Sequence, residues 1–510
     1  MNSIYGRRDF LKFAGLGALG VALFPRVGGQ GLPAAQGSAG KREAPTVQSL
    51  EKGPRRPNIV LILADDLGYE CIGADGCTSY KTPVLDQLAA TGVRFDQCHV
   101  QPLCTPTRAQ VMTGLYNVRN YTDFGELEAK NVTFGNLLKG AGYATCMAGK
   151  WQLGTDVALP KKFGFDEHCL WQHTRAGAGN TASRYLNPGL EINGVPKNYT
   201  HREYGPDIIS DYALDFIQRK KDQPFFLYYT MMLTHAPFQP TPDSADYSAK
   251  PPQGKAAMQT RPDGIIQHFA DMVAYTDKLV GKLLSKLEEL KLRDNTLLVF
   301  LGDNGTQHGV LTMMGDRKFI GGKGSPTDAG MHVPLIVSWP GRTPVGKVSH
   351  DLVDSTDLLP TVCEAAGVTV PAELKIDGRS FLPQIRGEQG QPRDWYYCWY
   401  APQKEQGIIA EFAATRDFKL SRTGDFFDLN KDIEEKFPLA VAALTGEAAA
   451  AAKLLQVVLD KYKDARPAAI AMPFLGPKKR GDGRGGGRKK KAAATAEAIE
   501  RANWRDEEWV

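Results

Sequence analysis

The 510-residue chain has the composition of a folded globular protein, with 42% hydrophobic and 23% charged residues. These fractions exclude a fibrous chain and a chain that is disordered throughout. The net charge of +5 is unevenly spread, because residues 1–35 contribute +3, residues 478–491 contribute +7, and the rest of the chain carries −5. A mildly acidic body offers no basic surface for phosphates, so nucleic acid is not an expected partner.

The first 35 residues have the pattern of an export signal. Arg7 and Arg8 precede an apolar run over residues 13–24, which is too short and too rich in glycine for a durable membrane anchor. A pair of arginines before such a run is typical of twin-arginine export. We therefore predict a signal over residues 1–35, export by the twin-arginine machinery, and a periplasmic or extracellular mature protein that does not span the membrane. An uncleaved N-terminal anchor is the alternative.

A linker over residues 36–56 leads into alternating apolar and amphipathic segments. Strands are expected over residues 58–64, 144–148, 225–232, 296–301 and 334–339, and helices over residues 83–91, 207–221, 267–291 and 355–366. Strands that alternate with helices predict an α/β fold, with a large, mostly parallel sheet flanked by helices, over residues 57–390.

The pattern of apolar runs in the sequence changes after Asp394. Short aromatic or apolar runs at residues 395–400, 407–414, 418–422 and 425–429 predict a smaller antiparallel sheet, and residues 440–463 predict a helix. We assign residues 391–470 to a C-terminal α+β subdomain. Residues 471–510 form a basic, glycine-rich tail with no apolar face to bury, and we expect this tail to be disordered.

Polar side chains follow several of the predicted strands. Asp65 and Asp66 come directly after the first strand, and Asp303 and Asn304 come after another. Each pair alone is more often a turn or a helix cap. Ligands in such sheets bind beyond the carboxyl ends of the strands, however, and oxygen side chains suit a hard cation. The sequence therefore predicts a shared site at this edge of the sheet.

The segment Cys104-Thr-Pro-Thr-Arg108 resembles the Cys-x-Pro-x-Arg signature of the type I sulfatases. Further segments follow in the order of that family, and the resemblance covers about residues 55–385: the paired aspartates, Gly-Lys-Trp-Gln-Leu-Gly at 149–154, His-Ala-Pro-Phe at 235–238, Gly-Asp-Asn-Gly at 302–305 and Gly-Gly-Lys-Gly at 321–324. The resemblance implies an alkaline-phosphatase-like fold and a maturation enzyme that oxidises Cys104 to Cα-formylglycine.

The resemblance also implies a role for each residue of the site. One Ca²⁺ ion per chain, with Mg²⁺ as the alternative, is held by five residues: Asp65, Asp66, Asp303, Asn304 and the oxidised Cys104. Hydrated formylglycine attacks the sulfur of a sulfate monoester and later releases inorganic sulfate. Arg108 orients the hydrate, Lys150 and Lys323 contact sulfate oxygens, and His235 protonates the leaving alcohol.

Gln152 departs from the family pattern, because many members have histidine at this position. Glutamine can form hydrogen bonds but cannot shuttle a proton near neutral pH. Another group could serve as the base, turnover could be slow, or Gln152 could only orient the hydrate. His308 is a candidate base, with an ordinary loop histidine as the alternative. Asp328 and His332 also differ from the commoner residues of the family.

Two further features leave alternatives open. The eight cysteines are too sparse for a disulfide scaffold, and Cys98 and Cys104 are buried thiols or a disulfide. Residues 165–206 are expected to form a long loop, in which Trp171, His173 and Arg175 line a pocket wall or a surface connection.

The predicted function is that of an exported sulfatase that converts a sulfate monoester to an alcohol and inorganic sulfate. A sulfated carbohydrate is the plausible substrate class. One alternative is a phosphonate monoester or phosphodiester hydrolase of the same superfamily. The other alternative is a catalytically silent protein that binds sulfated glycans. The glutamine at position 152 is the reason for this alternative.

Overall fold

The structure is a computed structural model that describes residues 56–175, 183–247, 251–252 and 254–476. The export signal predicted over residues 1–35 lies outside the described residues. The same holds for almost all of the linker over residues 36–56 and for most of the tail over residues 471–510. Within the described ranges, no helix combines the length and the apolar character that crossing a membrane requires.

The largest sheet has ten strands, in the order β13-β2-β12-β9-β1-β8-β4-β5-β6-β7. Its inner strands β9, β1, β8, β4 and β5 are all parallel to their neighbours in this run. The strands have the following bounds: β1 Asn58–Ala64, β2 Val93–Phe95, β4 Ala144–Lys150, β5 Glu167–Trp171, β6 Gly189–Ile192, β7 Val195–Asn198, β8 Phe225–Thr230, β9 Thr296–Gly302, β12 Leu335–Ser338 and β13 Lys347–Ser349.

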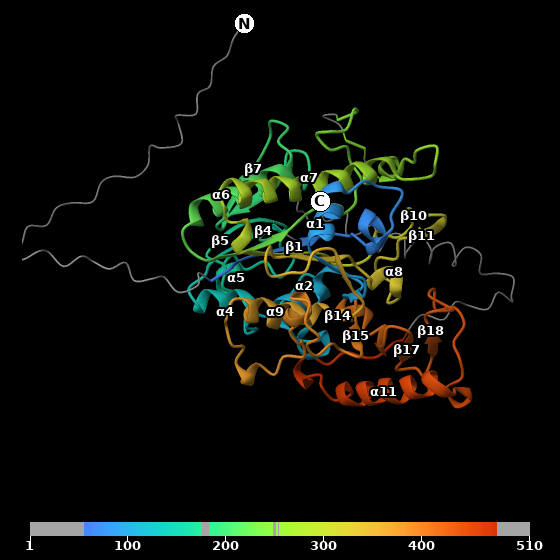
Figure 1. Ribbon diagram of the computed structural model, residues 1–510. Coiled ribbons are helices and arrows are strands. Elements are labelled where there is room, and N and C mark those ends of the chain that lie inside the picture. The colour runs from blue at the N-terminus through green and yellow to red at the C-terminus, as the bar shows by residue number, and fades with distance from the viewer. Residues whose placement is uncertain (1–55, 176–182, 248–250, 253, 477–510) are drawn as a thin grey trace, which may run out of the picture. The chain divides into compact units, whose positions relative to one another are not determined.

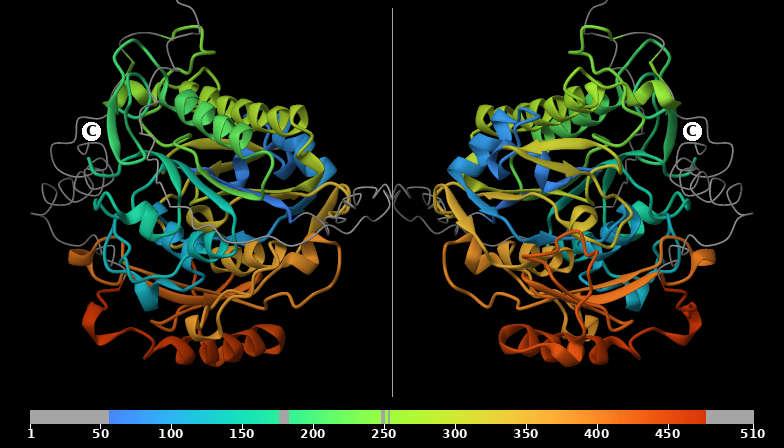
Figure 2. Two further views of the ribbon diagram at one scale, coloured as in Figure 1. Left: turned by 90° about the vertical axis from the view of Figure 1, so that its left-hand side faces the viewer. Right: turned by 90° about the vertical axis from the view of Figure 1, so that its right-hand side faces the viewer.

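Helices cover both faces of this sheet (Figures 1 and 2). One face packs against α1 Pro83–Thr91, α6 Gly205–Lys220 and α7 Gln267–Glu289, and the other against α2 Cys104–Thr113, α4 Phe134–Gly140 and α9 Leu358–Ala365. The side chains of strand β1 illustrate how both faces of the sheet are buried. Val60 and Ile62 belong to the first hydrophobic core, and Ile59, Leu61 and Leu63 belong to the second. Because successive side chains of a strand alternate between faces, a strand covered on both faces is apolar throughout.

A second, four-stranded antiparallel sheet follows near the C-terminus, in the order β15-β16-β17-β18. Its strands are β15 Tyr396–Tyr400, β16 Ala410–Ala414, β17 Phe418–Ser421 and β18 Phe426–Asp428. Helix α11 (Gly446–Tyr462) lies beside this sheet (Figure 1). Its residues Leu455 and Val458 are buried in a core shared with the sheet. The predicted α/β architecture with a smaller C-terminal antiparallel sheet is confirmed.

Short elements complete the described chain. The short helices are α3 Asn117–Asn120, α5 Leu159–Lys162, α8 Asp328–Met331 and α10 Leu382–Ile385. The short strands are β3 Cys98–His99, β10 Leu311–Met314, β11 Arg317–Ile320 and β14 Val353–Asp354. All eight cysteines are buried and unpaired, so the choice between thiols and a disulfide resolves to thiols.

Two details differ from the sequence-based predictions. Strand β12 runs antiparallel to both β9 and β2, whereas the sequence pattern predicts a mostly parallel sheet without a direction for this strand. The region over residues 165–206 is not one long loop, because it contains β5, β6 and β7. Both differences arise from short segments, whose apolar pattern indicates neither the direction of a strand nor its partner.

Candidate active site

The site lies at the carboxyl ends of neighbouring parallel strands. Asp65 and Asp66 follow β1, Asp303 follows β9, and Lys150 is the last residue of β4. Strand β1 pairs with β9 on one side and with β8 on the other, and β8 pairs with β4. The sheet order therefore brings residues that are far apart in the sequence to one edge, as ligand sites in parallel sheets require.

Three buried carboxylates form the centre of this cluster. The backbone N–H of Asp66 donates to Oδ1 of Asp303 at 3.0 Å, and Nδ2 of Asn304 donates to Oδ1 of Asp66 at 2.8 Å. Ligand atoms of Asp65, Cys104 and Asp303 lie within 4.8 Å of one another. The sequence-based prediction that position 104 lies near these carboxylates agrees with this geometry.

Each carboxylate has a cationic neighbour. Nζ of Lys150 donates to Oδ1 of Asp65 at 3.0 Å, and Nη2 of Arg108 donates to Oδ2 of Asp303 at 2.8 Å. Nζ of Lys323 donates to Oδ2 of Asp66 at 2.9 Å. The three cations come from α2, β4 and the segment before α8, so the sheet edge, the helix and this segment share one charged network.

The network shifts the pKa values of the three carboxyl groups in different directions. Burial raises the pKa of Asp65, but Lys150 and Arg108 outweigh burial and hold it below its usual value. Burial outweighs Lys323 at Asp66, whose pKa is raised. Burial and the charge of Asp65 raise the pKa of Asp303 to about 7, despite Arg108. Without a further positive charge, the site therefore disfavours full ionisation of the three groups.

The donor set fits a hard divalent cation. Among the described residues, Oδ1 of Asn304 is buried without a hydrogen-bond partner, and Oδ2 of Asp65 is buried with the ammonium group of Lys150 at 2.9 Å. Carboxylate and amide oxygens are the ligands that Ca²⁺ takes in proteins. A cation among Asp65, Asp66, Asp303 and Asn304 would give these oxygens a partner and would favour the ionised carboxylates.

Cys104 is the first residue of α2, a helix in which every residue is buried. Its Sγ atom lies 2.7 Å from Oε1 of Gln152 and donates to it. Burial is the main cause that raises the pKa of Cys104 to about 11. The thiolate is the nucleophilic form of cysteine, so an unmodified Cys104 is a poor nucleophile near neutral pH.

Gln152 faces Cys104 from the loop after β4. Its backbone has a φ of 52°, a left-handed conformation, and its N–H donates to the carbonyl of Gln172 at 3.4 Å. This conformation turns the side chain toward the start of α2. His308, the candidate base, is exposed and makes no hydrogen bond with the described residues of the site.

His235 contacts the network at Lys323 and Asp66. Its Nε2 atom is 2.9 Å from Nζ of Lys323 and 3.7 Å from Oδ2 of Asp66, and its Nδ1 atom contacts Nη1 of Arg184. Burial, and then the charges of Lys323 and Arg184, lower the pKa of His235 well below its usual value. The ring is therefore neutral near pH 7 in this arrangement.

Arg184 is a member of the site that sequence reasoning missed. Its side chain is buried, and its guanidinium group lies 4.3 Å from the centre of the Trp171 ring, in a cation–π contact. Trp171 is thus linked to the site through Arg184. His173 and Arg175 instead lie near Glu191 of β6, at 3.4 and 3.9 Å. No motif surrounds Arg184, so no sequence pattern indicates its role.

Comparisons with known proteins decide the family. Residues 57–368 match the sulfatase family, which is more than half of the chain. The chain belongs to the sulfatase family. Residues 323–449 also match the C-terminal region of N-sulphoglucosamine sulphohydrolase. These matches confirm the resemblance that the sequence motifs indicated.

Characterised relatives are similar over most of their length. N-acetylgalactosamine-6-sulfatase of Canis lupus familiaris is 34% identical over 448 residues, which cover 76% of this chain and 83% of that protein. Arylsulfatase A of Homo sapiens is 30% identical over 485 residues, covering 82% and 91%. This sulfatase is therefore a sulfuric ester hydrolase.

Solved structures share the fold. The crystal structure of Ps i-CgsB has a TM-score of 0.67 and 26% identity, and the match covers 88% of this sulfatase and 97% of that chain. The phosphonate monoester hydrolase of Agrobacterium radiobacter has a TM-score of 0.56 at 20% identity, covering 82% and 97%. That second likeness shows a common fold alone.

Proposed function

We propose that this protein is an exported, calcium-dependent sulfatase that hydrolyses a sulfate monoester of a carbohydrate once Cys104 has been oxidised to formylglycine. The observation that carries the proposal is the convergence of Cys104 with Asp65 and Asp303, whose ligand atoms lie within 4.8 Å of one another. The twin-arginine pattern within residues 1–35 supports export.

The environment of Cys104 supports the need for maturation. A thiol whose pKa is about 11 supplies little thiolate at neutral pH. A hydrated formylglycine would supply two hydroxyl groups, one to attack sulfur and one whose deprotonation releases sulfate. A maturation enzyme is therefore a required partner.

The cationic side chains would bind and orient the ester. We assign Lys150 and Lys323 to the sulfate oxygens as point charges, and Arg108 to the hydroxyl groups at position 104, one helical turn away. The N-terminus of α2 adds positive potential for an anion. Calcium held by Asp65, Asp66, Asp303 and Asn304 would neutralise charge on the sulfuryl group.

His235 is assigned to the oxygen of the leaving alcohol. It is neutral in the absence of substrate, because burial, Lys323 and Arg184 lower its pKa. An anionic ester beside the ring would raise that pKa, so that the ring could gain a proton on binding and pass it to the alcohol. The contact with Arg184 would fix the orientation of the ring.

The proposed substrate class comes from the relatives. The name of the dog relative specifies a 6-sulfate of N-acetylgalactosamine. Ps i-CgsB was also solved in complex with k-i-k-neocarrahexaose, and that structure is 25% identical with a TM-score of 0.66, covering 88% of this sulfatase and 97% of that chain. Both names point to sugars, which supports a sulfated carbohydrate as the substrate of this sulfatase.

Relative turnover of an aryl sulfate and an aryl phosphodiester tests the proposal, with protein produced alongside a maturation enzyme and the Cys104→Ala variant as the control. We expect faster release from the sulfate and no turnover by Cys104→Ala. Preference for the phosphodiester would favour the phosphonate-hydrolase alternative. Binding of sulfated glycans without turnover by fully converted protein would favour the silent binding protein.

A further inference from the structure

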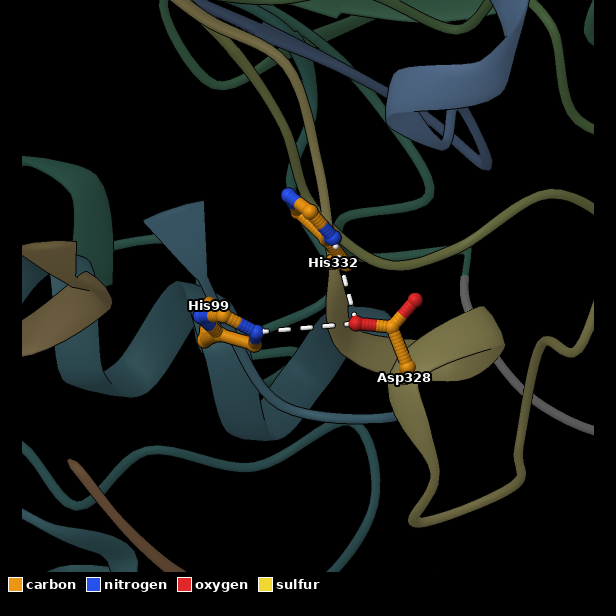
Figure 3. A group of neighbouring side chains, drawn as sticks. All are labelled: His99, Asp328 and His332. Atoms are coloured by element: carbon orange, nitrogen blue, oxygen red, sulfur yellow. Dashed lines mark hydrogen bonds and ion pairs between the residues drawn. The ribbon is translucent and has the colours of Figure 1, made fainter. Parts of the chain in front are cut away.

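A second cluster of metal-binding side chains lies outside the network of Cys104. Asp328 begins α8, His332 directly follows this helix, and His99 ends β3. Figure 3 shows both imidazole rings turned toward the same carboxylate oxygen. Nδ1 of His332 lies 3.1 Å from Oδ1 of Asp328, and Nε2 of His99 lies 3.7 Å from it. The backbones of the two histidines are joined by an antiparallel bridge, which holds the rings in register.

The hydrogen bonds of His332 determine which of its nitrogens faces the carboxylate. Nε2 lies 3.0 Å from the backbone carbonyl of Asp96, and a carbonyl can only accept, so Nε2 carries the hydrogen. In the neutral ring, Nδ1 then directs a lone pair at Asp328. Two electron-rich atoms face each other stably only if a proton or a metal ion lies between them. A backbone carbonyl that accepts from the second nitrogen is the usual partner of a metal-binding histidine.

The spacing of the three side chains fits one metal ion. Ligand atoms about 2.0–2.1 Å from a tetrahedral ion lie roughly 3.3 Å from one another. The two separations from Oδ1 of Asp328, 3.1 Å to His332 and 3.7 Å to His99, lie on either side of that value. All three ligand atoms lie within 4.8 Å of one another. The separation of 3.7 Å is also too long for a hydrogen bond between His99 and Asp328.

Burial and stacking hold the ligands in place. The exposed fractions of His99 and His332 are 4% and 8%, and Oδ2 of Asp328 is buried with no hydrogen-bond partner in the part of the chain that the structure describes. The His332 ring stacks on Tyr69 at 3.9 Å between centroids, and the His99 ring stacks on Tyr396 at 4.3 Å. Oδ2 of Asp328 is therefore available as a further metal ligand, and stacking restricts the rotation of both imidazole rings.

We propose that His99, Asp328 and His332 bind a Zn²⁺ ion that stabilises the fold. Two imidazole nitrogens and one carboxylate suit zinc, in contrast to the oxygen ligands proposed for calcium. Asp328 lies on the segment that also carries Lys323, while His99 precedes the helix of Cys104 and stacks on the C-terminal sheet through Tyr396. The ion would therefore tie three parts of the fold together without entering the chemistry of ester hydrolysis.

Zinc content and thermal stability test this site without reference to catalysis. The full chain, stripped with a chelator and dialysed against zinc in the presence of calcium, should retain about one zinc ion per chain. The His99→Gln and His332→Gln variants should retain none, while His308→Gln, which alters an exposed histidine, should match the wild type. Zinc at a hundredfold excess over its Kd should raise the Tm of the wild type by about 3 °C.

Two controls separate this site from the network around Cys104, where zinc could also bind. Asp303→Asn should keep the zinc ion, because it changes only that network. If His99→Gln and His332→Gln fail to fold, a Co²⁺ titration of Asp303→Asn should still give the visible absorption of a four-coordinate ion, which zinc abolishes. Equal zinc in the wild type and a folded His332→Gln variant would overturn the proposal. Absence of zinc binding by the wild type would also overturn it, because a proton and not a metal ion would then lie between His332 and Asp328.

Discussion

Sγ of Cys104 lies 2.7 Å from Oε1 of Gln152, and the thiol donates to the amide oxygen. This contact links the residue that carries the family signature to the residue that departs most from the family pattern. An amide can hold a hydroxyl group at position 104 in one orientation, but it cannot remove a proton from it near neutral pH. Gln152 is therefore best understood as a positioning residue.

Gln152→Ala should lower kcat on an aryl sulfate by about tenfold, because one hydrogen bond to the nucleophile is lost. The measurement is steady-state turnover, normalised to the converted fraction of residue 104. Gln172→Ala is a matched control: its φ of 58° is also positive, and its side chain makes no hydrogen bond to Cys104. Equal kcat for Gln152→Ala and the wild type would remove Gln152 from the mechanism.

Asp303→Asn should weaken calcium binding and lower kcat/KM by about a thousandfold. The change removes a negative charge from the proposed metal site and leaves Arg108 without its partner at 2.8 Å. Elemental analysis after dialysis measures the calcium, and Asp222→Asn, at an exposed position, controls for the loss of one carboxylate. Unchanged calcium content in Asp303→Asn would refute this ligand assignment.

Gly149→Ala should destabilise the protein by about 3 kcal/mol and also reduce activity. Gly149 has a φ of 125°, and an added Cβ would lie 1.6 Å from the carbonyl oxygen of Thr230 on the paired strand. The strands would have to separate, which would displace Lys150 from Asp65. Gly142→Ala, with a φ of 86° and open space around its Cβ, should cost only about 1 kcal/mol in urea unfolding. Similar losses for both variants would show that backbone strain, and not the clash, limits this position.

Glu70→Gln should be more stable than the wild type at pH 8 by about 3 kcal/mol, with little difference near pH 4.5. Burial raises the pKa of Glu70 to about 7 in the folded protein. A carboxyl group with a raised pKa contributes its full stability below its unfolded pKa and loses it as the pH rises through the folded value. Glutamine resembles the protonated acid and avoids this loss. Urea unfolding at both pH values measures the effect, and a difference that does not change with pH would contradict the role of ionisation.

Much of the architecture could be predicted because long apolar runs determine it. The run over residues 58–64 is buried on both faces of the sheet, so every position is apolar, and Asp65 marks the point where it ends. Such ends meet at one edge of a parallel sheet, which is why the sequence alone predicts that the carboxylates of Asp65 and Asp303 lie together.

Other features depend on tertiary contacts that no local sequence pattern indicates. Arg184 reaches His235 only because the chain between β5 and α6 folds back over Trp171. Strand β7 was missed because all four of its residues are exposed and one of them is Pro196, so that it lacks the apolar alternation of a predicted strand. The His99 cluster likewise required the tertiary bridge to His332.

The most direct test of the account is peptide mass spectrometry of residue 104 together with sulfate release in the same preparations. Oxidation of Cys104 to formylglycine lowers its mass by about 18 Da, since sulfur and two hydrogens are exchanged for oxygen. Preparations made with increasing amounts of a maturation enzyme give a series of converted fractions. We expect a rate of sulfate release that rises in proportion to the converted fraction and vanishes at zero conversion. Equal rates from unconverted and fully converted protein would contradict it.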